Sequence, residues 1–292
     1  MLLLIGGESD PNIVLLDKVA RSLGVNVESL IVGENHHPTI SWNIINDTLT
    51  INHRLIKPTS VFIRHDAFSS LSDQREEVSA RSASWFTTLA NWVLAHPTVK
   101  CFNKNSLNGS HGKPQVLALA NRLGIDIPDT VISNDIQNLT EINKTAQLVV
   151  KPVFGGGFCE EFKHACTELD LNNGASAMPA IVQERLAQPE VRIYRIGDSF
   201  YPFLMESTSL DYRVKQDCNI TPLDTDKFDK NIIFLLKKLT DNLKMKFAAA
   251  DYKTCPTTGE LLFLEVNAQP MFTVFDKKLN GRLSTAIIKQ LS

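Results

Sequence analysis

Short apolar runs alternate with amphipathic stretches over the first hundred residues. The run LLLIGG predicts a buried strand, and the apolar spacing in Asn12–Leu23 predicts a helix after it. We expect further strands at VNVESLIV, in the extended stretch ISWNIINDTLTINHRL and at SVFIR, followed by a long helix from about Asp73 to His96. This alternation is typical of an open α/β sheet, which we expect for residues 1–102.

Two further units are expected at residues 103–185 and 186–292. The polar stretch FNKNSLNGS has the composition of a linker or hinge before the second unit, in which a helix runs from Lys113 to Leu123 and ends at Gly124. Strands of the second unit are predicted at Thr130–Ser133 and Gln147–Val153. In the third unit the pattern predicts strands near Val191–Ile196, Phe200–Glu206, Phe247–Asp251 and Leu261–Val266, and helices near Asp224–Leu243 and Arg282–Leu291.

Composition narrows the class of protein. The 292 residues are 43% hydrophobic and 21% charged with a net charge of −2, which is typical of a folded globular protein and gives no basic excess for nucleic acid. The N-terminal apolar run is too short for a signal peptide or a membrane span, so we expect a cytoplasmic protein. Its five cysteines are odd in number and lack CxxC spacing, which favours reduced thiols over disulfides or zinc.

A lysine and three glycines end one predicted strand. In QLVVKPVFGGG, Lys151 follows a buried run and Gly155–Gly157 follow Lys151. Consecutive glycines expose backbone N–H groups that can surround phosphate oxygens. A flexible hairpin turn would give the same pattern, and neither a Walker nor a dinucleotide-binding glycine motif is present.

Carboxylates converge near the C-terminus. The hairpin loop TCPTTGE joins the strands Ala249–Lys253 and Leu261–Asn267, which brings Asp251 close to Glu265 and Asn267. Two carboxylates and an amide oxygen suit Mg²⁺, although a solvated acidic rim is the alternative. Farther upstream, Glu190 and Arg192 alternate with apolar residues, as an exposed cross-strand pair or a nucleotide-binding strand would.

Together these motifs resemble one family. From Gly112 onward the chain is similar to ATP-grasp ligases that add glutamate to ribosomal protein S6, and to those that macrocyclise microviridin-type peptides (graspetides). The resemblance rests on HGKPQVLALANRLGIDIPDT, QLVVKPVFGGG, LAQPEVR, LDYR and FLEVNAQP. The N-terminal unit matches mainly at SVFIRHDAF, where His65–Asp66 replace the second arginine of many graspetide synthetases, and LDYR continues with VKQDC rather than Asn-x-His.

The resemblance implies an ATP-grasp fold, in which an N-terminal α/β domain precedes two subdomains that enclose ATP. It also implies that ATP phosphorylates a substrate carboxylate and that an amine or hydroxyl attacks the acyl phosphate. Implied ATP contacts are Lys113 and Lys151 at the phosphates, Gly155, Gly156 and Gly157 as a lid, Gln183, Glu184 and Leu186 at adenine, and Glu190 at ribose. Asp251, Glu265 and Asn267 would bind Mg²⁺, as two ions. Arg192 and Arg213 would act on the γ-phosphate and acyl phosphate, and Arg64 and His65 on the substrate.

Three functions remain open from the sequence. A ligase acting on a peptide or protein is the main hypothesis, a ligase of amino acids or dipeptides is the second, and an ATP-binding regulator without ligase activity is the third. Retention of both lysines and of the three metal-site residues favours an enzyme. An aromatic stripe around Trp85 and Trp92 in the helix before His96 favours internal packing or a homodimer.

Overall fold

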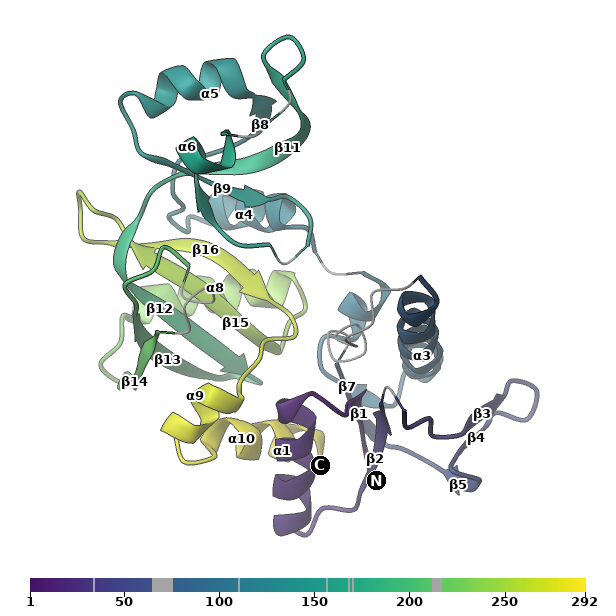
Figure 1. Cartoon of the computed structure of the whole chain (residues 1–292). Coiled ribbons are helices and arrows are strands. Elements are labelled where there is room, and N and C mark those ends of the chain that lie inside the picture. Colours follow the sequence, from purple (N-terminus) through teal and green to yellow (C-terminus); the bar gives the residue numbers. More distant parts are fainter. Residues whose placement is uncertain are drawn as a thin grey trace.

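Three units follow one another along the chain in the computed structural model (Figure 1). The structure describes residues 1–33, 35–64, 76–109, 111–155, 157–167, 169, 171–211 and 217–292. None of the helices in these ranges is both long and apolar enough to span a membrane.

The first unit is a parallel sheet with the order β2-β1-β6-β7. Its strands are β1 (Leu2–Gly7), β2 (Val27–Val32), β6 (Ser60–Ile63) and β7 (Lys100–Cys101). Because side chains alternate along a strand, Leu2 and Leu4 face helix α1 (Pro11–Ser22), while Leu3 and Ile5 face helix α3 (Glu76–Ala95). The predicted open α/β sheet is confirmed.

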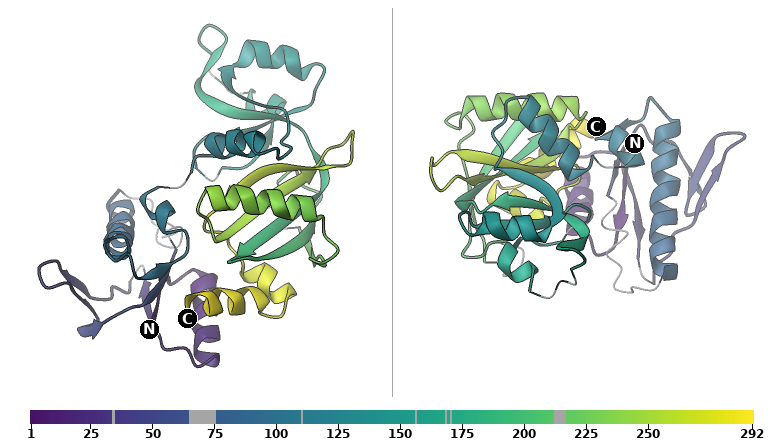
Figure 2. Two further views of the ribbon diagram at one scale, coloured as in Figure 1. Left: turned by 180° about the vertical axis from the view of Figure 1, so that it is seen from behind. Right: turned by 90° about the horizontal axis from the view of Figure 1, so that it is seen from above.

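An antiparallel arm extends from the first unit. It consists of β3 (Ile40–Asn43), β4 (Thr48–Ile51) and β5 (Arg54–Ile56), and Figure 2 shows it projecting away from the rest of the chain. Leu49 and Ile51 anchor it in the core under α3. The stripe of α3 packs in the same core through Leu89, Trp92 and Val93, so these residues serve internal packing.

The second unit contains the antiparallel sheet β10-β9-β11-β8. Its strands are β8 (Thr130–Asp135), β9 (Leu148–Pro152), β10 (Glu160–Glu161) and β11 (Ala175–Glu184), and its helices are α5 (Ile136–Asn143) and α6 (Phe162–Ala165). A small core of Leu139, Leu148, Phe162 and Val182 joins the helices to the sheet.

The third unit is built on the antiparallel sheet β14-β13-β12-β15-β16. Its strands are β12 (Ala187–Ile196), β13 (Ser199–Glu206), β14 (Asn219–Pro222), β15 (Phe247–Thr254) and β16 (Leu261–Asn267). Helices α8 (Lys230–Asn242) and α4 (Lys113–Arg122) share a core with one face, and α9 (Thr273–Lys278) and α10 (Arg282–Leu291) share a core with the other. Helix α4 therefore packs on the third unit although it precedes the second along the chain.

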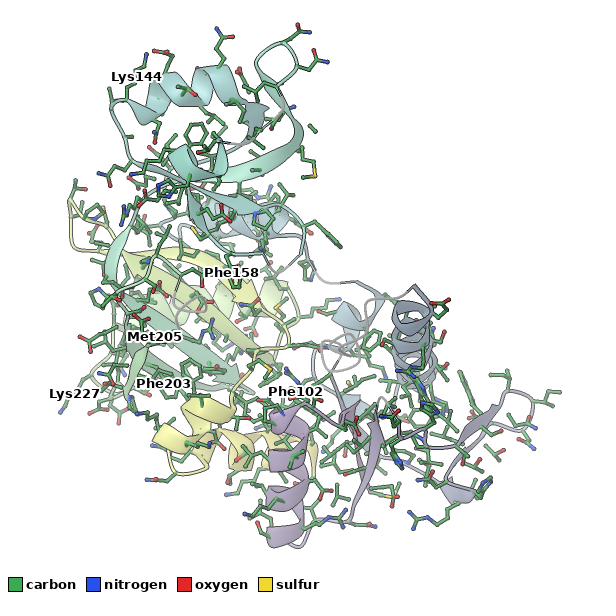
Figure 3. The ribbon with its side chains drawn as sticks, in the orientation of Figure 1. Phe102, Lys144, Phe158, Phe203, Met205 and Lys227 are labelled. Carbon is green, nitrogen blue, oxygen red and sulfur yellow. The ribbon has the colours of Figure 1, made fainter. Side chains whose placement is uncertain are left out.

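Aromatic side chains join the first unit to the third. Phe102, which follows β7 and is labelled in Figure 3, and Phe62 lie against Phe247 of β15, with ring centroids 5.6 and 5.4 Å from it. Phe272 packs on the same ring at 6.0 Å. Helix α10 also returns to pack on α1. The two ends of the chain thus meet in one core.

Several elements differ from the prediction. The helix expected from Asp224 begins only at Lys230, because the carboxylate of Asp229 accepts hydrogen bonds from the N–H groups of Asn231 and Ile232 and caps it there. Helices α5 and α9 were not predicted. The expected linker FNKNSLNGS contains a 3₁₀ helix, η1 (Lys104–Asn108), and Asn103 before it is buried.

Candidate functional site

One face of the third sheet changes from apolar to charged along β12 and β15. Tyr194 lies in the core, whereas Arg192 and Glu190 on the same face of β12 pair in register with Asp251 and Lys253 of β15. Arg192 donates hydrogen bonds to both carboxylate oxygens of Asp251, at 2.6 and 2.8 Å. Lys253 Nζ donates to Glu190 Oε1 at 2.7 Å. The predicted alternative of an exposed Glu190–Arg192 pair is wrong, because each side chain is mostly buried on an opposite charge.

Oxygen ligands gather at the end of β16. Glu265 lies opposite Asp251 in the ladder, and Asn267 Nδ2 donates to Glu265 Oε1 at 3.2 Å. Burial raises the pKa of Asp251, the neighbouring Arg192 opposes that rise, and the negative charge of Glu265 adds to it. Two carboxylates and an amide oxygen so placed fit a hard divalent cation such as Mg²⁺. Metal binding by these three residues stays a prediction.

The glycine loop contacts the predicted early lysine. Lys113 stands at the start of α4, and its Nζ donates to the carbonyl of Gly155 at 3.1 Å. Gly155 has a φ of +83°, a conformation that favours glycine, and a Cβ at Gly157 would lie 2.9 Å from Cγ of Pro152. Gly156 lies outside the described residues. Lys113 and Gly155 thus lie together, while their contact with ATP phosphates stays a prediction.

Beyond the glycines, the chain runs close to the charged side chains of Glu190 and Lys253. The N–H of Cys159 donates to a carboxylate oxygen of Asp211 at 3.2 Å. Burial raises the pKa of the Cys159 thiol, and the charges of Lys151 and Lys253 oppose the rise. A thiol with a raised pKa is a weak nucleophile, which disfavours a catalytic role for Cys159. The half-exposed ring of Phe158 lies where the second and third units meet (Figure 3).

A pocket of about 350 Å³ opens where β11 passes into β12. It is lined by Gln147, Arg185, Leu186, Ala187, Gln188, Ser207, Thr208, Ser209, Leu210, Lys253 and Pro256. Within the described chain, Gln188 Oε1 and Ser209 Oγ are buried without a hydrogen-bond partner. Buried polar atoms require partners, so these two fit a pocket that receives a polar ligand.

Sequence reasoning missed most residues of this pocket, including three with polar side chains that face it or line it. Leu186 was predicted there, but Gln188, Ser209 and Lys253 were not. Lys253 could have been found, because it lies two residues after Asp251 on one strand and therefore on the same face. No sequence spacing links Gln188 or Ser209 to the site. Gln188 lies at the start of β12 and Ser209 follows the end of β13, so their meeting depends on how these strands pair.

Some predicted residues lie elsewhere. Gln183 is 2% exposed, and its Nε2 donates to Thr130 Oγ1 at 2.9 Å, so its side chain is used within the second sheet. Arg64 is 1% exposed, and its guanidinium binds groups of the chain itself, which gives no support to substrate contact. His65 and Arg213 lie outside the described residues.

No family model matches the chain, and no curated protein matches it either. Solved structures match it over nearly all its length. The ATP-grasp ligase PsnB, complexed with a phosphomimetic variant of its minimal precursor, Mg and ADP, is 20% identical with a TM-score of 0.78, covering 100% of this chain and 98% of that one. The macrocyclase MdnC from Microcystis aeruginosa MRC, bound with precursor peptide MdnA, is 16% identical with a TM-score of 0.72, covering 99% and 98%. The chain has the ATP-grasp fold.

A third neighbour is named as a ligase of two amino acids. VanG D-Ala:D-Ser ligase from Enterococcus faecalis is 18% identical with a TM-score of 0.63, and the match covers 99% of this chain and 97% of VanG. In this fold Lys113 contacts Gly155, and Asp251 lies opposite Glu265 in the ladder of β15 and β16. The predicted fold is confirmed, while the predicted division at residues 102 and 185 stays a prediction.

Proposed function

We propose that the protein is an ATP-dependent ligase that joins a carboxylate to an amine or a hydroxyl on a peptide or protein substrate. The observation that carries the proposal is the presence of two sets of groups, which are linked by the charge of Lys151 acting on Asp251. Lys113 lies against the glycine loop at Gly155, and Asp251, Glu265 and Asn267 lie together at the ends of two strands. The lysine and the backbone N–H groups of the loop suit phosphate oxygens, and the carboxylate and amide oxygens suit Mg²⁺, so the two sets together suit a magnesium nucleotide.

The neighbouring structures support a peptide as the substrate. PsnB has been solved with its precursor peptide PsnA2 and AMPPNP, and MdnC with precursor peptide MdnA. A ligase from Chryseobacterium gregarium with a TM-score of 0.68 has been solved with ADP and a leader and core peptide. Each matches this chain over almost its full length. We infer that the carboxylate belongs to a peptide encoded near the gene for this protein.

The residues of the chain would divide the work as follows. Lys113 and Lys151 neutralise phosphate oxygens, and Gly155 and Gly157 close over the nucleotide and exclude water, which protects an acyl phosphate from hydrolysis. Glu190 accepts hydrogen bonds from ribose hydroxyls. Arg192 balances charge on the transferred phosphoryl group, a role we also assign to Arg213.

The nucleotide would also need a metal. Asp251, Glu265 and Asn267 would hold Mg²⁺, as two ions, which supplies charge neutralisation for the phosphates. Leu186 and the backbone of Glu184 would lie against adenine.

All five cysteines are free, which agrees with a reducing cytoplasm as the location.

A small-molecule ligase is the second candidate, favoured by the likeness to VanG D-Ala:D-Ser ligase. The discriminating property is the size of the carboxylate substrate. Free amino acids or dipeptides would be sufficient for this second function, whereas the first function requires a longer peptide. An ATP-binding regulator would show neither activity.

Release of ADP with Mg²⁺ tests the proposal. The purified protein is incubated with ATP, Mg²⁺ and either free amino acids or synthetic peptides encoded by neighbouring genes, and product mass is followed. The expected result is a mass loss of about 18 Da from the peptide, one water for each bond formed, together with stoichiometric ADP. ATP turnover with amino acids alone would favour the second function, and ATP binding without turnover on any substrate would contradict both ligase functions.

A further inference from the structure

The segment that follows Asn267 is held by the first unit of the chain. Residues 268–273 follow β16 and pass close to α1, to the end of β6 and to the residue before η1, all of which are far from them in sequence. Hydrogen bonds to this segment come from Arg64, Asn12 and Asn103. The predicted metal ligands therefore stand directly before a stretch whose position the first unit determines.

Arg64 makes the densest set of these contacts. Its Nη1 donates to the carbonyls of Gln269 and Pro270, at 3.1 and 3.0 Å, and its Nη2 lies 2.8 Å from the sulfur of Met271. Its Nε donates to Asp10, with which it forms an ion pair buried to within a few per cent on both sides. A planar guanidinium can reach all four partners at once, which an ammonium cannot.

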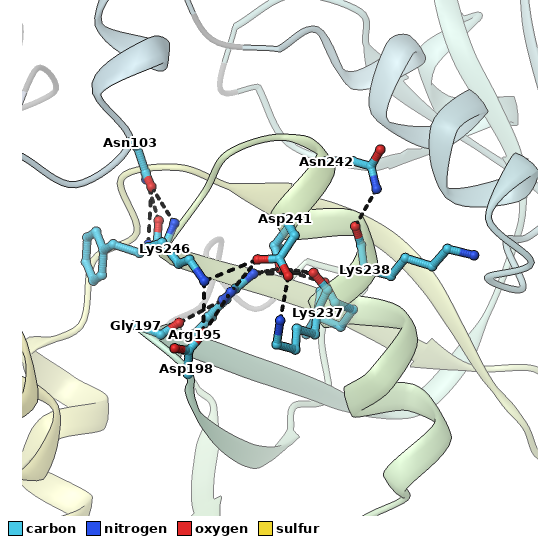
Figure 4. Close-up of polar contacts among 12 residues, drawn as sticks. Asn103, Arg195, Gly197, Asp198, Lys237, Lys238, Asp241, Asn242 and Lys246 are labelled. Carbon is cyan, nitrogen blue, oxygen red and sulfur yellow. Dashed lines mark hydrogen bonds and ion pairs between the residues drawn. The ribbon is translucent and has the colours of Figure 1, made fainter.

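Two asparagines complete the attachment. Asn12 Oδ1 accepts from the N–H groups of Phe272 and Thr273, at 2.9 and 3.1 Å, and from Thr273 Oγ1 at 2.9 Å. Asn103 Nδ2 donates to the carbonyl of Ala268 at 2.7 Å, and its Oδ1 accepts from the N–H of Lys246 at 2.9 Å (Figure 4). Asn12 also lies on Asp10, so the α1 cap and Arg64 form one network.

We propose that Arg64 is a positioning residue for the magnesium site, acting through residues 268–271 on Asn267 and Glu265. The inference rests on the proposed function, since it concerns the same site. It replaces direct substrate contact as the role of Arg64.

The physical reason is the precision that a metal site requires. Ligands must be held within about 0.5 Å of their working geometry, and loss of an outer hydrogen-bond partner costs about 10- to 100-fold in metal affinity. Asn267 is the last residue of β16. Two carbonyls fixed by Arg64 at Gln269 and Pro270 limit how far Asn267 can move.

Binding of AMPPNP, measured by calorimetry with Mg²⁺ and with EDTA, tests this role. Arg64→Lys keeps a cation beside Asp10 but cannot bind both carbonyls. We expect it to weaken binding with Mg²⁺ by about tenfold and to leave binding with EDTA unchanged. Thr273→Val, which removes one hydroxyl and preserves shape, is expected to act in the same direction by about threefold.

Arg195→Lys is the matched control. Arg195 is as buried as Arg64, but it binds Gly197, Thr240 and Asp241 at the far end of β12 (Figure 4). We expect this variant to lower thermal stability without changing the effect of Mg²⁺. An equal loss of magnesium-dependent binding in Arg195→Lys, or none in Arg64→Lys and Thr273→Val, would overturn the inference.

Failure of the proposed function looks different. If the wild-type protein binds AMPPNP no more tightly with Mg²⁺ than with EDTA, the proposed function fails before any variant is compared. If Mg²⁺ strengthens binding in the wild type and equally in Arg64→Lys and Thr273→Val, the function stands and only the role of Arg64 is wrong.

Discussion

Arg192 and Asp251 face each other across β12 and β15 and form a two-point ion pair, with 2.6 and 2.8 Å between their nitrogen and oxygen atoms. The guanidinium also lies 5.4 Å from the ring centroid of Phe275, which supports its position from the other side. A cation that binds Asp251 must therefore compete with Arg192 for the same oxygens. Displacement from Asp251 would leave the guanidinium of Arg192 available for the phosphate role that we propose for it.

Asp251→Asn tests the metal role of this carboxylate. The amide is similar in shape but carries no charge for Mg²⁺, so we expect ATP turnover to fall by about 100-fold or more. The fold should persist, because the amide oxygen still accepts from Arg192. Turnover is followed by ADP release over a range of Mg²⁺ concentrations.

Asp198→Asn provides the control for Asp251→Asn, because Asp198 is an exposed carboxylate on the β12–β13 turn. Its turnover is expected to match that of the wild type. Wild-type activity in Asp251→Asn at every Mg²⁺ concentration would show that Asp251 is not a metal ligand.

The Lys253–Glu190 pair predicts a pH effect. Burial raises the pKa of Glu190, while the charge and hydrogen bond of Lys253 hold it down. Lys253→Met should raise this pKa further, so that more Glu190 is protonated at mildly acidic pH and contact with ribose is lost. We expect KM for ATP to rise by about tenfold at mildly acidic pH, with the acidic limb of kcat/KM moved to higher pH. Lys253→Arg should restore the wild-type limb, and an unchanged limb in Lys253→Met would refute the coupling.

The Arg195 network predicts a stability effect (Figure 4). Although burial opposes it, hydrogen bonds from Lys237 and Arg195 lower the pKa of Asp241 from 3.8. A lowered carboxylate pKa adds stability above 3.8, and that stability is lost as the pH falls through the folded-state value. Asp241→Asn should therefore cost about 1 kcal/mol at pH 7, allowing for solvent screening of the partly exposed carboxylate.

Urea unfolding at several pH values checks the effect of Asp241→Asn. The difference from the wild type should be constant from about pH 5 to pH 8, because this range lies above the ordinary pKa of 3.8, and it should narrow only below that value. If the difference in the free energy of unfolding between the wild type and Asp241→Asn grew on acidification, the explanation from the lowered pKa of Asp241 would be contradicted.

Tyr252 offers a stabilising change. Its ring is 2% exposed and packs against Phe263 at 5.5 Å between centroids, while its buried hydroxyl has no hydrogen-bond partner within the described residues. Tyr252→Phe keeps the ring and removes a hydroxyl whose hydrogen bonds to water are lost on folding and not replaced. The free energy of unfolding should therefore rise by about 1 kcal/mol. Tyr194→Phe is the matched control, because the Tyr194 hydroxyl donates to the carbonyl of Met271. That variant should be destabilised, and equal effects in both would contradict the explanation.

Local patterns predicted the elements with strong periodicity. Helix α10 was predicted with its observed bounds, Arg282–Leu291, because its apolar residues recur at helical spacing. Helix α5 was missed because its eight residues are too few for a clear period, although Asp135 caps it by accepting from the N–H of Asn138. The contacts of Asn103 with β15 were beyond the sequence, since a single side chain there makes bonds to residues more than a hundred positions away.

Only the part of the site that lies on a single hairpin was predictable from the sequence. Asp251 and Glu265 could be placed together because a short loop joins their strands. The pairing of Arg192 with Asp251 depends on the register of strands 59 residues apart, which no local pattern sets. Arg64 was assigned to the substrate from its place at a strand end, but its direction there is set by Asp10, 54 residues away.

The packing of α10 on α1 affects how the chain is made. Ile13, Leu16 and Ala20 of α1 share a core with Leu283 and Ile287 of α10. During synthesis the first unit emerges long before residues 282–291, so the apolar face of α1 stays uncovered while the other units form. Until α10 is made, the nascent chain therefore exposes an apolar surface that can aggregate, and the core around α1 is completed only when α10 packs on it.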